Sequence, residues 1–204
     1  MTFGMDRLAG ENRPSSLQRT TEAKLLVPRI LPLFFFCLSS STAIGVEGPS
    51  PEPVRGVWVA NVASSALSSP QAIREFVDLA DSCGLNTLYV VVWNRGYTTY
   101  PSEVMQRHFK KKCDPRYADF DMLAEITAAA HARQMRVIAW FEFGFSCSYN
   151  EPDGGHIIRK YPNWAALDKK GNLASKNNFQ WMNAFHPEVQ DFVLSLLKEV
   201  VEKY

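Results

Sequence analysis

Polar side chains stand at three places where the sequence predicts that a strand ends. Asn61 follows a first segment rich in valine, Trp93, Asn94 and Arg95 close a second segment, and Glu142 lies near the end of a third. Asparagine, arginine and carboxylate side chains form hydrogen bonds with hydroxyl groups. A carboxylic acid can also transfer the proton that glycoside hydrolysis requires. These residue types predict a saccharide site at the strand ends, with Glu142 as its candidate catalytic residue.

Glu142 is the only carboxylate in the otherwise apolar segment RVIAWFEF. Burial in such a segment raises the pKa of a carboxyl group toward the range in which a general acid works. Two further roles stay open for Glu142: contact with the substrate without a chemical step, and an ion pair with Arg95 or Arg136 that only orients the strand end. Glycoside hydrolysis needs two carboxylates roughly 5 to 9.5 Å apart, and this sequence offers one candidate.

Aromatic residues crowd the same parts of the sequence. An aromatic ring offers a large, flat apolar face, on which the apolar face of a sugar ring can stack. Tyr97, Trp140 and Trp181, together with Trp93, are predicted to contact the substrate in this way. The other aromatic residues expected at this rim are Tyr100, Phe143, Phe145, Tyr149 and Trp164.

Alternating strands and helices must position these side chains. The apolar segments 54–61, 87–93 and 136–143 predict three strands. The first helix is expected to begin at Ser69 and Pro70, to bury Ile73, Phe76, Val77 and Ala80, and to stop at Gly84. The second is expected to begin at Asp119 or Asp121 and to bury Leu123, Ile126, Ala129 and Ala130. The third begins at His186, which is expected to cap it, and its apolar residues recur with the period of a helix up to Tyr204.

This order of elements, βαβαβα, predicts a parallel sheet with right-handed crossovers. An open doubly wound sheet and a (β/α)₈ barrel are the two candidates. No G-x-G-x-x-G turn follows the first strand, which argues against an open sheet that binds a dinucleotide. Long loops follow the second and third strands, at 95–118 and 144–185, whereas the chain returns from helix to strand in short turns. Barrel enzymes build their sites in the loops that follow the carboxyl ends of the strands. The long loops at these places therefore favour a partial (β/α)₈ TIM barrel made of the first three units.

Three units are too few to close a barrel, which takes about 250 residues. The sequence therefore predicts an open sheet with a bare edge strand and an apolar helix stripe that nothing covers.

The first part of the chain has the order of an export signal. Lys24 and Arg29 precede an apolar run at 30–38, and small residues follow at 39–45. The run is shorter than the roughly 20 residues of a membrane helix, although a buried strand or a retained anchor stays open. We expect a disordered or upstream-start extension at 1–21, a signal peptide at 22–45, a proline-rich linker at 46–53 and the barrel domain at 54–204. The mature protein would be exported to the periplasm or the exterior, without a membrane span.

Composition and the distribution of cysteine and histidine limit the remaining possibilities. The formal net charge is +1 with interspersed signs, so no nucleic-acid partner is expected. Neither the cysteines nor His108, His131 and His156 have metal-ligand spacing, so no metal and no cofactor are predicted. Cys83 is expected to be buried at the end of the first helix.

Five long segments together resemble the glycosyl hydrolase-like 10 family of exported bacterial barrel proteins. They are RGVWVAN, CGLNTLYVVVWNRGYTTYPS, RVIAWFEFGF, YPNWAALDKKGN and WMNAFHPEVQDFVLSLLKEVVEKY. The resemblance implies a TIM-barrel hydrolase whose partner is a bacterial or cell-wall polysaccharide. It also implies that Glu142 matches a polar residue after the third strand, and that Asn183 and His186 match a substrate-binding segment.

Relatives of that family continue into a fourth strand that ends in paired aspartates, their candidate catalytic carboxylates. This sequence lacks that strand, so the resemblance implies a chain truncated at the C-terminus and inactive as a hydrolase. The alternative is a noncatalytic carbohydrate-binding protein, or a barrel fragment that a partner completes. At Gln134, relatives tend to have a glycine, and a left-handed backbone there would cost on the order of 1 kcal/mol.

Overall fold

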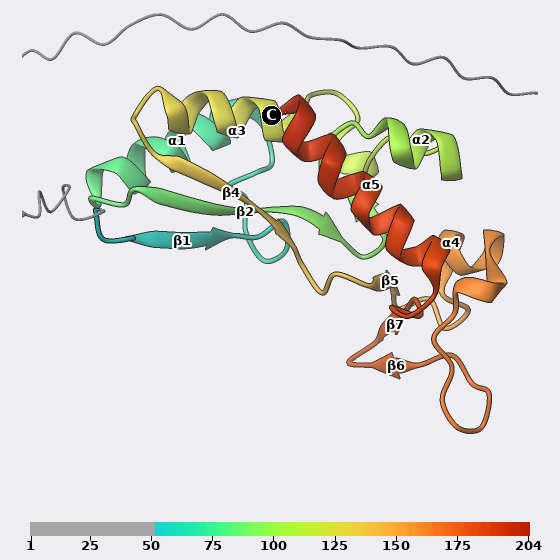
Figure 1. Ribbon diagram of the computed structural model, residues 1–204. Helices are drawn as coiled ribbons and strands as arrows, with labels where there is room; N and C mark the ends of the chain where they lie inside the picture. The colour runs from blue at the N-terminus through green and yellow to red at the C-terminus, as the bar shows by residue number, and fades with distance from the viewer. Residues whose placement is uncertain (1–51) are drawn as a thin grey trace, which may run out of the picture. The chain divides into compact units, whose positions relative to one another are not determined.

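The computed structural model describes residues 52–204, and a parallel sheet forms its centre. β2 (Thr87–Asn94) lies between β1 (Gly56–Val59) and β4 (Arg136–Phe141), and all three strands run in the same direction. A short strand, β3 (Tyr97–Thr98), folds back antiparallel on the end of β2. Figure 1 shows the three parallel strands side by side, as the alternating pattern of the sequence predicts.

The long helices all lie on one face of this sheet (Figure 1). α1 (Pro70–Ser82) begins after Ser69, and α3 (Met122–His131) begins after Asp121. Each of these two capping side chains accepts a hydrogen bond from a backbone amide of the first turn, which has no partner inside the helix. Both starts agree with the sequence, and Asp121 rather than Asp119 is the cap.

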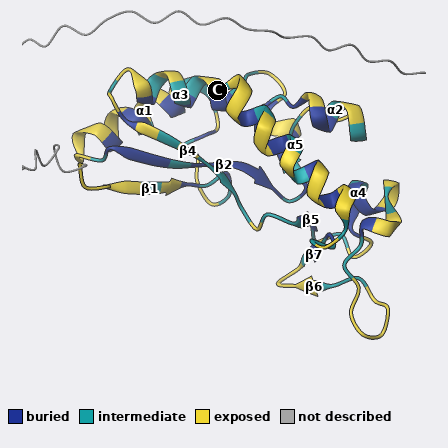
Figure 2. Cartoon of the chain, in the orientation of Figure 1, coloured by how far each residue is buried: buried dark blue, intermediate teal, exposed yellow. Residues whose placement is uncertain are grey.

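The register of the sheet decides which side chains face away from the helices. Side chains at paired positions of neighbouring strands lie on the same face, and Trp58, Tyr89 and Ile138 are paired across the sheet. The Trp58 ring stacks on the Tyr89 ring at 4.8 Å between centroids, and 61% of Trp58 is exposed. Figure 2 shows β2 buried and β1 mostly exposed. Among the described strands, β1 and β4 pair only with β2, which confirms the open sheet.

α5 (Pro187–Lys203) carries two apolar stripes, one buried and one exposed. The buried stripe packs into the core and consists of Val189, Phe192, Leu196 and Val200. The exposed stripe consists of Leu194, Leu197 and Val201. The uncovered apolar helix stripe that the sequence predicts is therefore present on this helix.

The two long loops contain more regular structure than the sequence predicts. The first holds α2 (Glu103–Phe109) and a 3₁₀ turn, η1 (Pro115–Tyr117). The second holds α4 (Gly155–Lys160), η2 (Pro162–Trp164) and a small antiparallel sheet of β5 (Ser146–Tyr149), β7 (Phe179–Trp181) and β6 (Ser175–Lys176). This small sheet lies beyond the end of β4 in Figure 1.

Several local expectations are corrected or confirmed by the structure. Cys83 is exposed rather than buried, and it stands at the C-cap of α1, after the buried residues of that helix. His186 precedes α5 but its side chain makes no capping hydrogen bond. Gln134 has φ of 58°, the left-handed conformation that favours glycine. The extension, signal peptide and most of the linker fall outside the described residues.

None of the helices within residues 52–204 combines the length and the apolar character that crossing a membrane requires.

Candidate functional site

Three strand ends bring polar side chains together at the carboxyl edge of the sheet. Asn94 Nδ2 donates a hydrogen bond of 2.9 Å to Asn61 Oδ1, which joins the end of β2 to the residues after β1. The Glu142 amide donates to the carbonyl of Trp93 at 3.1 Å, which places Glu142 beside the end of β2. Asn61 and Asn94 are only 5% and 3% exposed. The structure therefore joins the side chains of Asn61 and Asn94 and places the backbone of Glu142 beside the end of β2.

The Glu142 carboxyl group is partly buried and lacks a partner for one oxygen. Glu142 Oε2 is inaccessible and makes no hydrogen bond within the described chain. Burial raises the pKa of Glu142, and the positive charge of Arg95 partly offsets that rise. No ion pair of Glu142 is recorded among residues 52–204. Arg136 begins β4, so it lies at the opposite end of the strand from Glu142, about 20 Å away at 3.3 Å per residue. The ion pair that would have explained Glu142 as a structural residue is absent from this part of the chain.

Glu142→Gln is expected to stabilise the domain in a pH-dependent way. Because the folded-state pKa of Glu142 is raised, ionisation opposes folding: the penalty is absent below the ordinary pKa of 4.5 and complete above the folded-state pKa. The gain in unfolding free energy of the variant over wild type should therefore increase between about pH 4 and pH 8. Urea unfolding at both pH values measures it, with Glu202→Gln on the exposed face of α5 as the control for loss of a charge. An equal difference at the two pH values would refute the buried-carboxyl assignment.

Arg95 links the strand ends to the small sheet. It adopts φ of 55° in the tight turn after β2, and its guanidinium lies 4.3 Å from the centroid of the Tyr149 ring. This is the distance at which a cation interacts with an aromatic face. Arg95 Nε is buried and has no hydrogen-bond partner within the described residues. Arg95 thus holds its charge near Glu142 without a direct ion pair.

Four aromatic rings continue from Arg95 across the small sheet, and we call them the aromatic row. Its members in order of contact are Tyr149, Phe179, Phe143 and Trp181, with centroids 4.9, 4.6 and 6.5 Å apart. Phe143 follows Glu142 directly and is about half exposed. Sequence reasoning names the other three members but misses Phe179, which only the pairing of β5 with β7 brings to this place.

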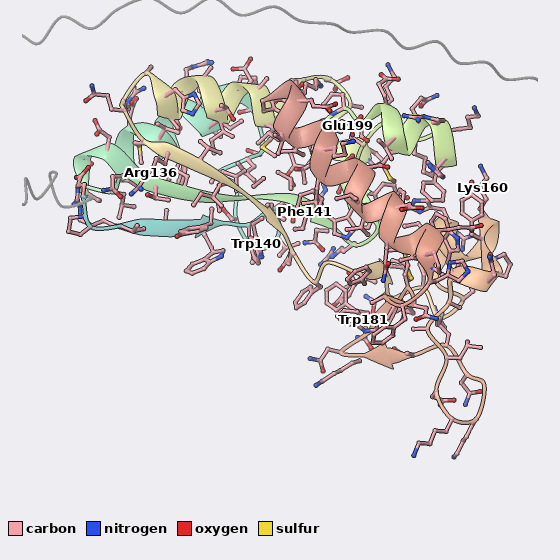
Figure 3. All side chains as sticks on the ribbon, in the orientation of Figure 1. Arg136, Trp140, Phe141, Lys160, Trp181 and Glu199 are labelled. Carbon is pink, nitrogen blue, oxygen red and sulfur yellow. The ribbon has the colours of Figure 1, made fainter. Side chains whose placement is uncertain are left out.

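Trp140 precedes Glu142 by two residues, and Trp181 lies in β7 of the small sheet. Trp140 is paired with Val91, so it faces the side of the sheet that lacks helices, and Glu142 follows the last residue of β4. Figure 3 shows Trp140 at the end of β4 that leads toward Trp181 in the small sheet. Both tryptophans are half-buried, which leaves ring surface for a ligand.

The structure corrects the prediction that Trp93 contacts substrate. A β-bulge between Val91 and Trp93 adds one residue to β2, and Trp93 therefore pairs with Phe141 and turns to the helix side. Its ring lies 6.1 Å from that of Phe192 in α5, and Trp93 is 1% exposed. Trp93 is a core residue.

Other predicted rim residues lie away from Glu142. Tyr97 is partly buried with its ring 4.6 Å from that of His156 in α4. Tyr100 and Trp164, which were expected at the rim, are buried. The rim is therefore made by the aromatic row and Trp140.

Asn183 and His186 organise the start of α5. Asn183 Oδ1 accepts a 3.0 Å hydrogen bond from the backbone amide of Phe185, and the backbone amide of Asn183 donates to the carbonyl of Trp164. His186 Nε2 lies 3.4 Å from Asn163 Nδ2. No hydrogen bond recorded for residues 52–204 joins either residue to Glu142. Their predicted role in substrate binding stays a prediction.

Two residues of the long loop after β2, which sequence reasoning does not single out, hold Asn61 in place. Arg116 donates to the carbonyl of Asn61 at 2.8 Å, and its Nε lies 3.0 Å from Asp114 Oδ1. Asp114 also accepts from the amide of Arg116 and caps η1. These residues lie in the long loop after β2, and no periodic pattern marks them.

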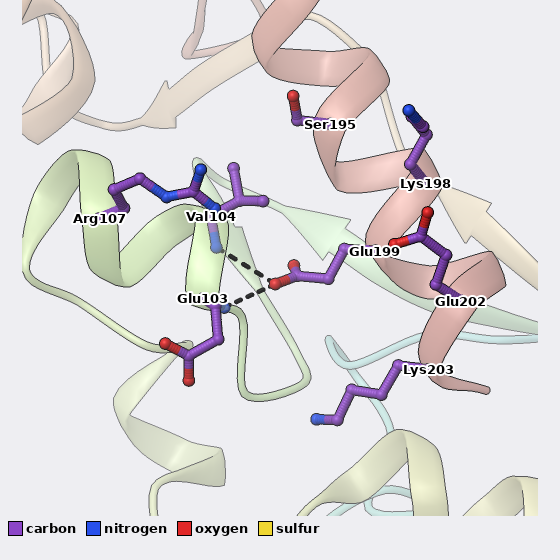
Figure 4. Close-up of a pocket in the computed structure, with 8 residues that line it drawn as sticks. All are labelled: Glu103, Val104, Arg107, Ser195, Lys198, Glu199, Glu202 and Lys203. Atoms are coloured by element: carbon purple, nitrogen blue, oxygen red, sulfur yellow. Dashed lines mark hydrogen bonds between the residues drawn. The ribbon is translucent and has the colours of Figure 1, made fainter.

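A cavity of about 480 Å³ lies on the helix side, between α2 and α5 (Figure 4). Its main feature is the Glu199 carboxylate, which accepts hydrogen bonds from the amides of Glu103 and Val104 at 2.6 and 3.1 Å. The hydroxyls of Tyr100 and Ser102 also donate to it. A carboxylate at the start of a helix binds amides that have no partner inside the helix. Glu199 therefore holds α2 against α5 and is a structural residue.

Glu199→Gln is expected to lower the unfolding free energy by about 1–3 kcal/mol, because the amide group of glutamine cannot accept the bonds that one carboxylate oxygen now accepts. Chemical denaturation measures the loss. Glu202→Gln, three residues further along α5, removes the same charge at an exposed position and should change stability by less than about 0.5 kcal/mol. Equal effects of the two substitutions would show that Glu199 acts only through its charge.

Residues 52–204 contain no group of three or more His, Cys, Asp or Glu side chains that could hold a metal ion.

Solved structures define the class of fold to which this site belongs. The chain is similar to a hypothetical protein of Ruminiclostridium thermocellum, with a TM-score of 0.52 and 19% identity, over 72% of this chain and 70% of that one. It is also similar to the α-galactosidase of Lactobacillus brevis, with a TM-score of 0.51 and 17% identity, over 74% of this chain and 19% of that one. The chain has the fold of part of a (β/α)₈ barrel, with its polar residues at the carboxyl ends of the strands.

Within that class, the chain belongs to the glycosyl hydrolase-like 10 family, whose model matches residues 53–204. It is 26% identical over 180 residues to glycosyl hydrolase DigH of Escherichia coli K12, covering 76% of this chain and 40% of that protein. It is 24% identical over 196 residues to glycosyl hydrolase YngK of Bacillus subtilis 168, covering 89% of this chain and 37% of that protein. The chain thus spans about two fifths of the length of these relatives, and the family resemblance seen in the sequence is confirmed.

Proposed function

We propose that this glycoside hydrolase-like domain binds a bacterial or cell-wall polysaccharide at the carboxyl ends of β1, β2 and β4. The observation that carries the proposal is a pair of buried acceptor oxygens without partners, Asn94 Oδ1 and Glu142 Oε2, at neighbouring strand ends. A buried polar atom without a partner costs about 1–3 kcal/mol. Hydroxyl groups of a sugar are donors of the kind that both oxygens lack, and the side chains that now cover these oxygens must move to admit a sugar.

The surroundings of the two oxygens suit a saccharide. The aromatic row and Trp140 offer apolar ring faces beside Glu142, while Arg95 and Asn61 offer polar groups on the side of β2 and β1. Sugars combine apolar ring faces with hydroxyl groups, so a mixed surface of this kind matches both parts of the ligand. The relatives named glycosyl hydrolases support a glycan as the ligand.

We further propose that this chain by itself binds glycan without hydrolysing it. Hydrolysis requires a second carboxylate within about 10 Å of the first. The raised pKa of Glu142 arises from burial, and the one charge that acts on it among residues 52–204 is that of Arg95. A nearby second carboxylate would have raised that pKa further. Glu142 is then a sugar-contacting residue without a carboxylate partner among residues 52–204.

Binding to isolated bacterial cell walls tests the proposal. Wild-type protein should sediment with the walls, and Glu142→Gln should weaken binding about tenfold or more, as expected for a lost hydrogen bond to a charged group. Glu202→Gln, on the helix side, is the matched control and should bind as wild type does. Failure of the wild-type protein to bind, or equal binding of all three proteins, would overturn the glycan site at Glu142.

A reducing-end assay on the same walls tests the absence of hydrolysis. We expect no release of reducing ends by the wild-type chain. Release that disappears in Glu142→Gln would overturn this part of the proposal and make Glu142 a catalytic residue.

Export of the chain belongs to the same proposal. It is supported by the basic, apolar and small residues in succession at 24–45. Protease treatment of cells with a permeabilised outer membrane tests it, because a tagged domain that has been exported is then degraded whereas one retained in the cytoplasm is protected.

A further inference from the structure

A second hollow adjoins the strand-end site on the side of β1. It has a volume of about 450 Å³, within the range of small-molecule sites. Its lining comes from the loop between β1 and α1 and from η1: Asn61, Ser64, Ser65, Ser68, Arg116 and Tyr117. Because Asn61 lines the hollow and also bonds Asn94, the hollow and the strand-end site share one wall.

The wall of this hollow is held rigidly from two directions. Arg116 donates to the carbonyl of Asn61 at 2.8 Å, while the Asp114 carboxylate fixes the guanidinium of Arg116 from the other side. The amide of Asp114 donates in turn to the carbonyl of Thr98 in β3 at 2.8 Å. The loop after β1 is therefore tied to the end of β2, and Asn61 keeps one orientation. Such preorganisation favours binding because little order is lost when a ligand enters.

The charges in the hollow determine the class of ligand. Arg116 is its one cationic residue, and Asp114 neutralises that charge through three hydrogen-bonding contacts between the guanidinium and the carboxylate. The other lining residues offer hydroxyl and amide groups. An anion such as a phosphate or a uronate needs an unpaired cation or several free amides, whereas a neutral polyol is served by hydroxyl and amide groups alone.

From this lining we infer that the hollow is a binding position for a further neutral sugar unit of the glycan chain, next to the unit at Glu142. The inference rests on the proposed function, because it extends the same ligand. The chain of sugars would run from the aromatic row over Glu142 and Asn94 to the serine-lined hollow. A ligand long enough to reach the hollow gains hydrogen bonds that a shorter ligand lacks.

Length-dependent binding tests this inference by isothermal titration calorimetry. The probes are the di- and tetrasaccharides of β-1,4-linked N-acetylglucosamine and of β-1,4-linked glucose, with tetragalacturonate as the anionic counterpart. For at least one neutral pair, wild-type protein should bind the tetrasaccharide about tenfold more tightly than the disaccharide, which corresponds to ~1.4 kcal/mol. Tetragalacturonate should bind no better than a disaccharide.

Two variants separate the hollow from the rest of the site. Ser65→Leu fills the hollow from an exposed loop position and should remove the advantage of the tetrasaccharide while leaving disaccharide binding unchanged. Arg116→Lys keeps the charge but loses the bidentate pairing with Asp114, and it should reduce the same advantage. Ser82→Leu, at the far end of α1, is the control and should behave as wild type.

Each outcome bears on one of the two ideas. If wild type binds no probe, the proposed function fails, and this inference fails with it. If wild type binds but Ser65→Leu and Arg116→Lys keep the full length advantage, the hollow is not a sugar position although the strand-end site stands. Tight binding of tetragalacturonate would overturn the assignment of a neutral ligand.

Discussion

Replacement of Gly96 by alanine is expected to lower the free energy of unfolding by about 3–5 kcal/mol. A Cβ at Gly96 would lie 2.1 Å from the carbonyl oxygen of Cys147. That oxygen belongs to the backbone of β5 and cannot move without shifting the small sheet. Gly96 also has φ of 81°, a conformation that costs other residues about 1 kcal/mol.

Gly84→Ala is a matched control for the conformational part of this effect. Gly84 has φ of 72°, and an added Cβ there meets nothing within 4 Å. The control should therefore lose only about 1 kcal/mol. Urea unfolding followed by far-ultraviolet circular dichroism measures both variants. Similar losses at the two glycines would show that β5 does not press against the turn after β2.

Phe192→Ala is expected to destabilise the domain by about 3–5 kcal/mol, because it opens a cavity where α5 joins the rest of the core. The Phe192 ring lies 6.1 Å from Trp93, 5.6 Å from Phe109 and 5.4 Å from Trp164. These three rings belong to β2, α2 and η2, so one side chain holds three elements to the helix.

Val201→Ala is the control for Phe192→Ala within the same helix. Val201 is 82% exposed, and its truncation should change the unfolding free energy by less than about 0.5 kcal/mol. Equilibrium denaturation monitored by tryptophan fluorescence measures both. Should the two substitutions have the same effect, the docking of α5 through Phe192 would be refuted.

The parts of the fold that local chemistry determines were predictable from the sequence. Ser69 with Pro70 and Asp121 mark helix starts because their side chains satisfy free amides, and both helices begin where expected. The apolar segment 87–93 predicted the buried strand that the structure has as β2. The position of Glu142 near the end of a strand was also predictable, because Glu142 is the one carboxylate near the end of the apolar segment 136–143.

The parts that depend on long-range pairing were not predictable. Trp93 faces the core because a bulge in β2 shifts its alternation, and the bulge depends on the pairing with β4. Phe179 reaches the aromatic row only through the small sheet. One local signal was available for that sheet: Asn177 and Asn178 both have positive φ, as in the tight hairpins that favour asparagine.

The exposed Trp58 ring has a spectroscopic consequence. Trp93 and Trp164 are buried, and Trp140 and Trp181 are half-buried, so Trp58 is the indole most open to water. A soluble quencher such as acrylamide should reach it first. Any molecule that covers this side of the β-strands would shield the Trp58 indole, and its emission would shift toward the blue. The fluorescence of Trp58 would thus report contacts on that surface without an added label.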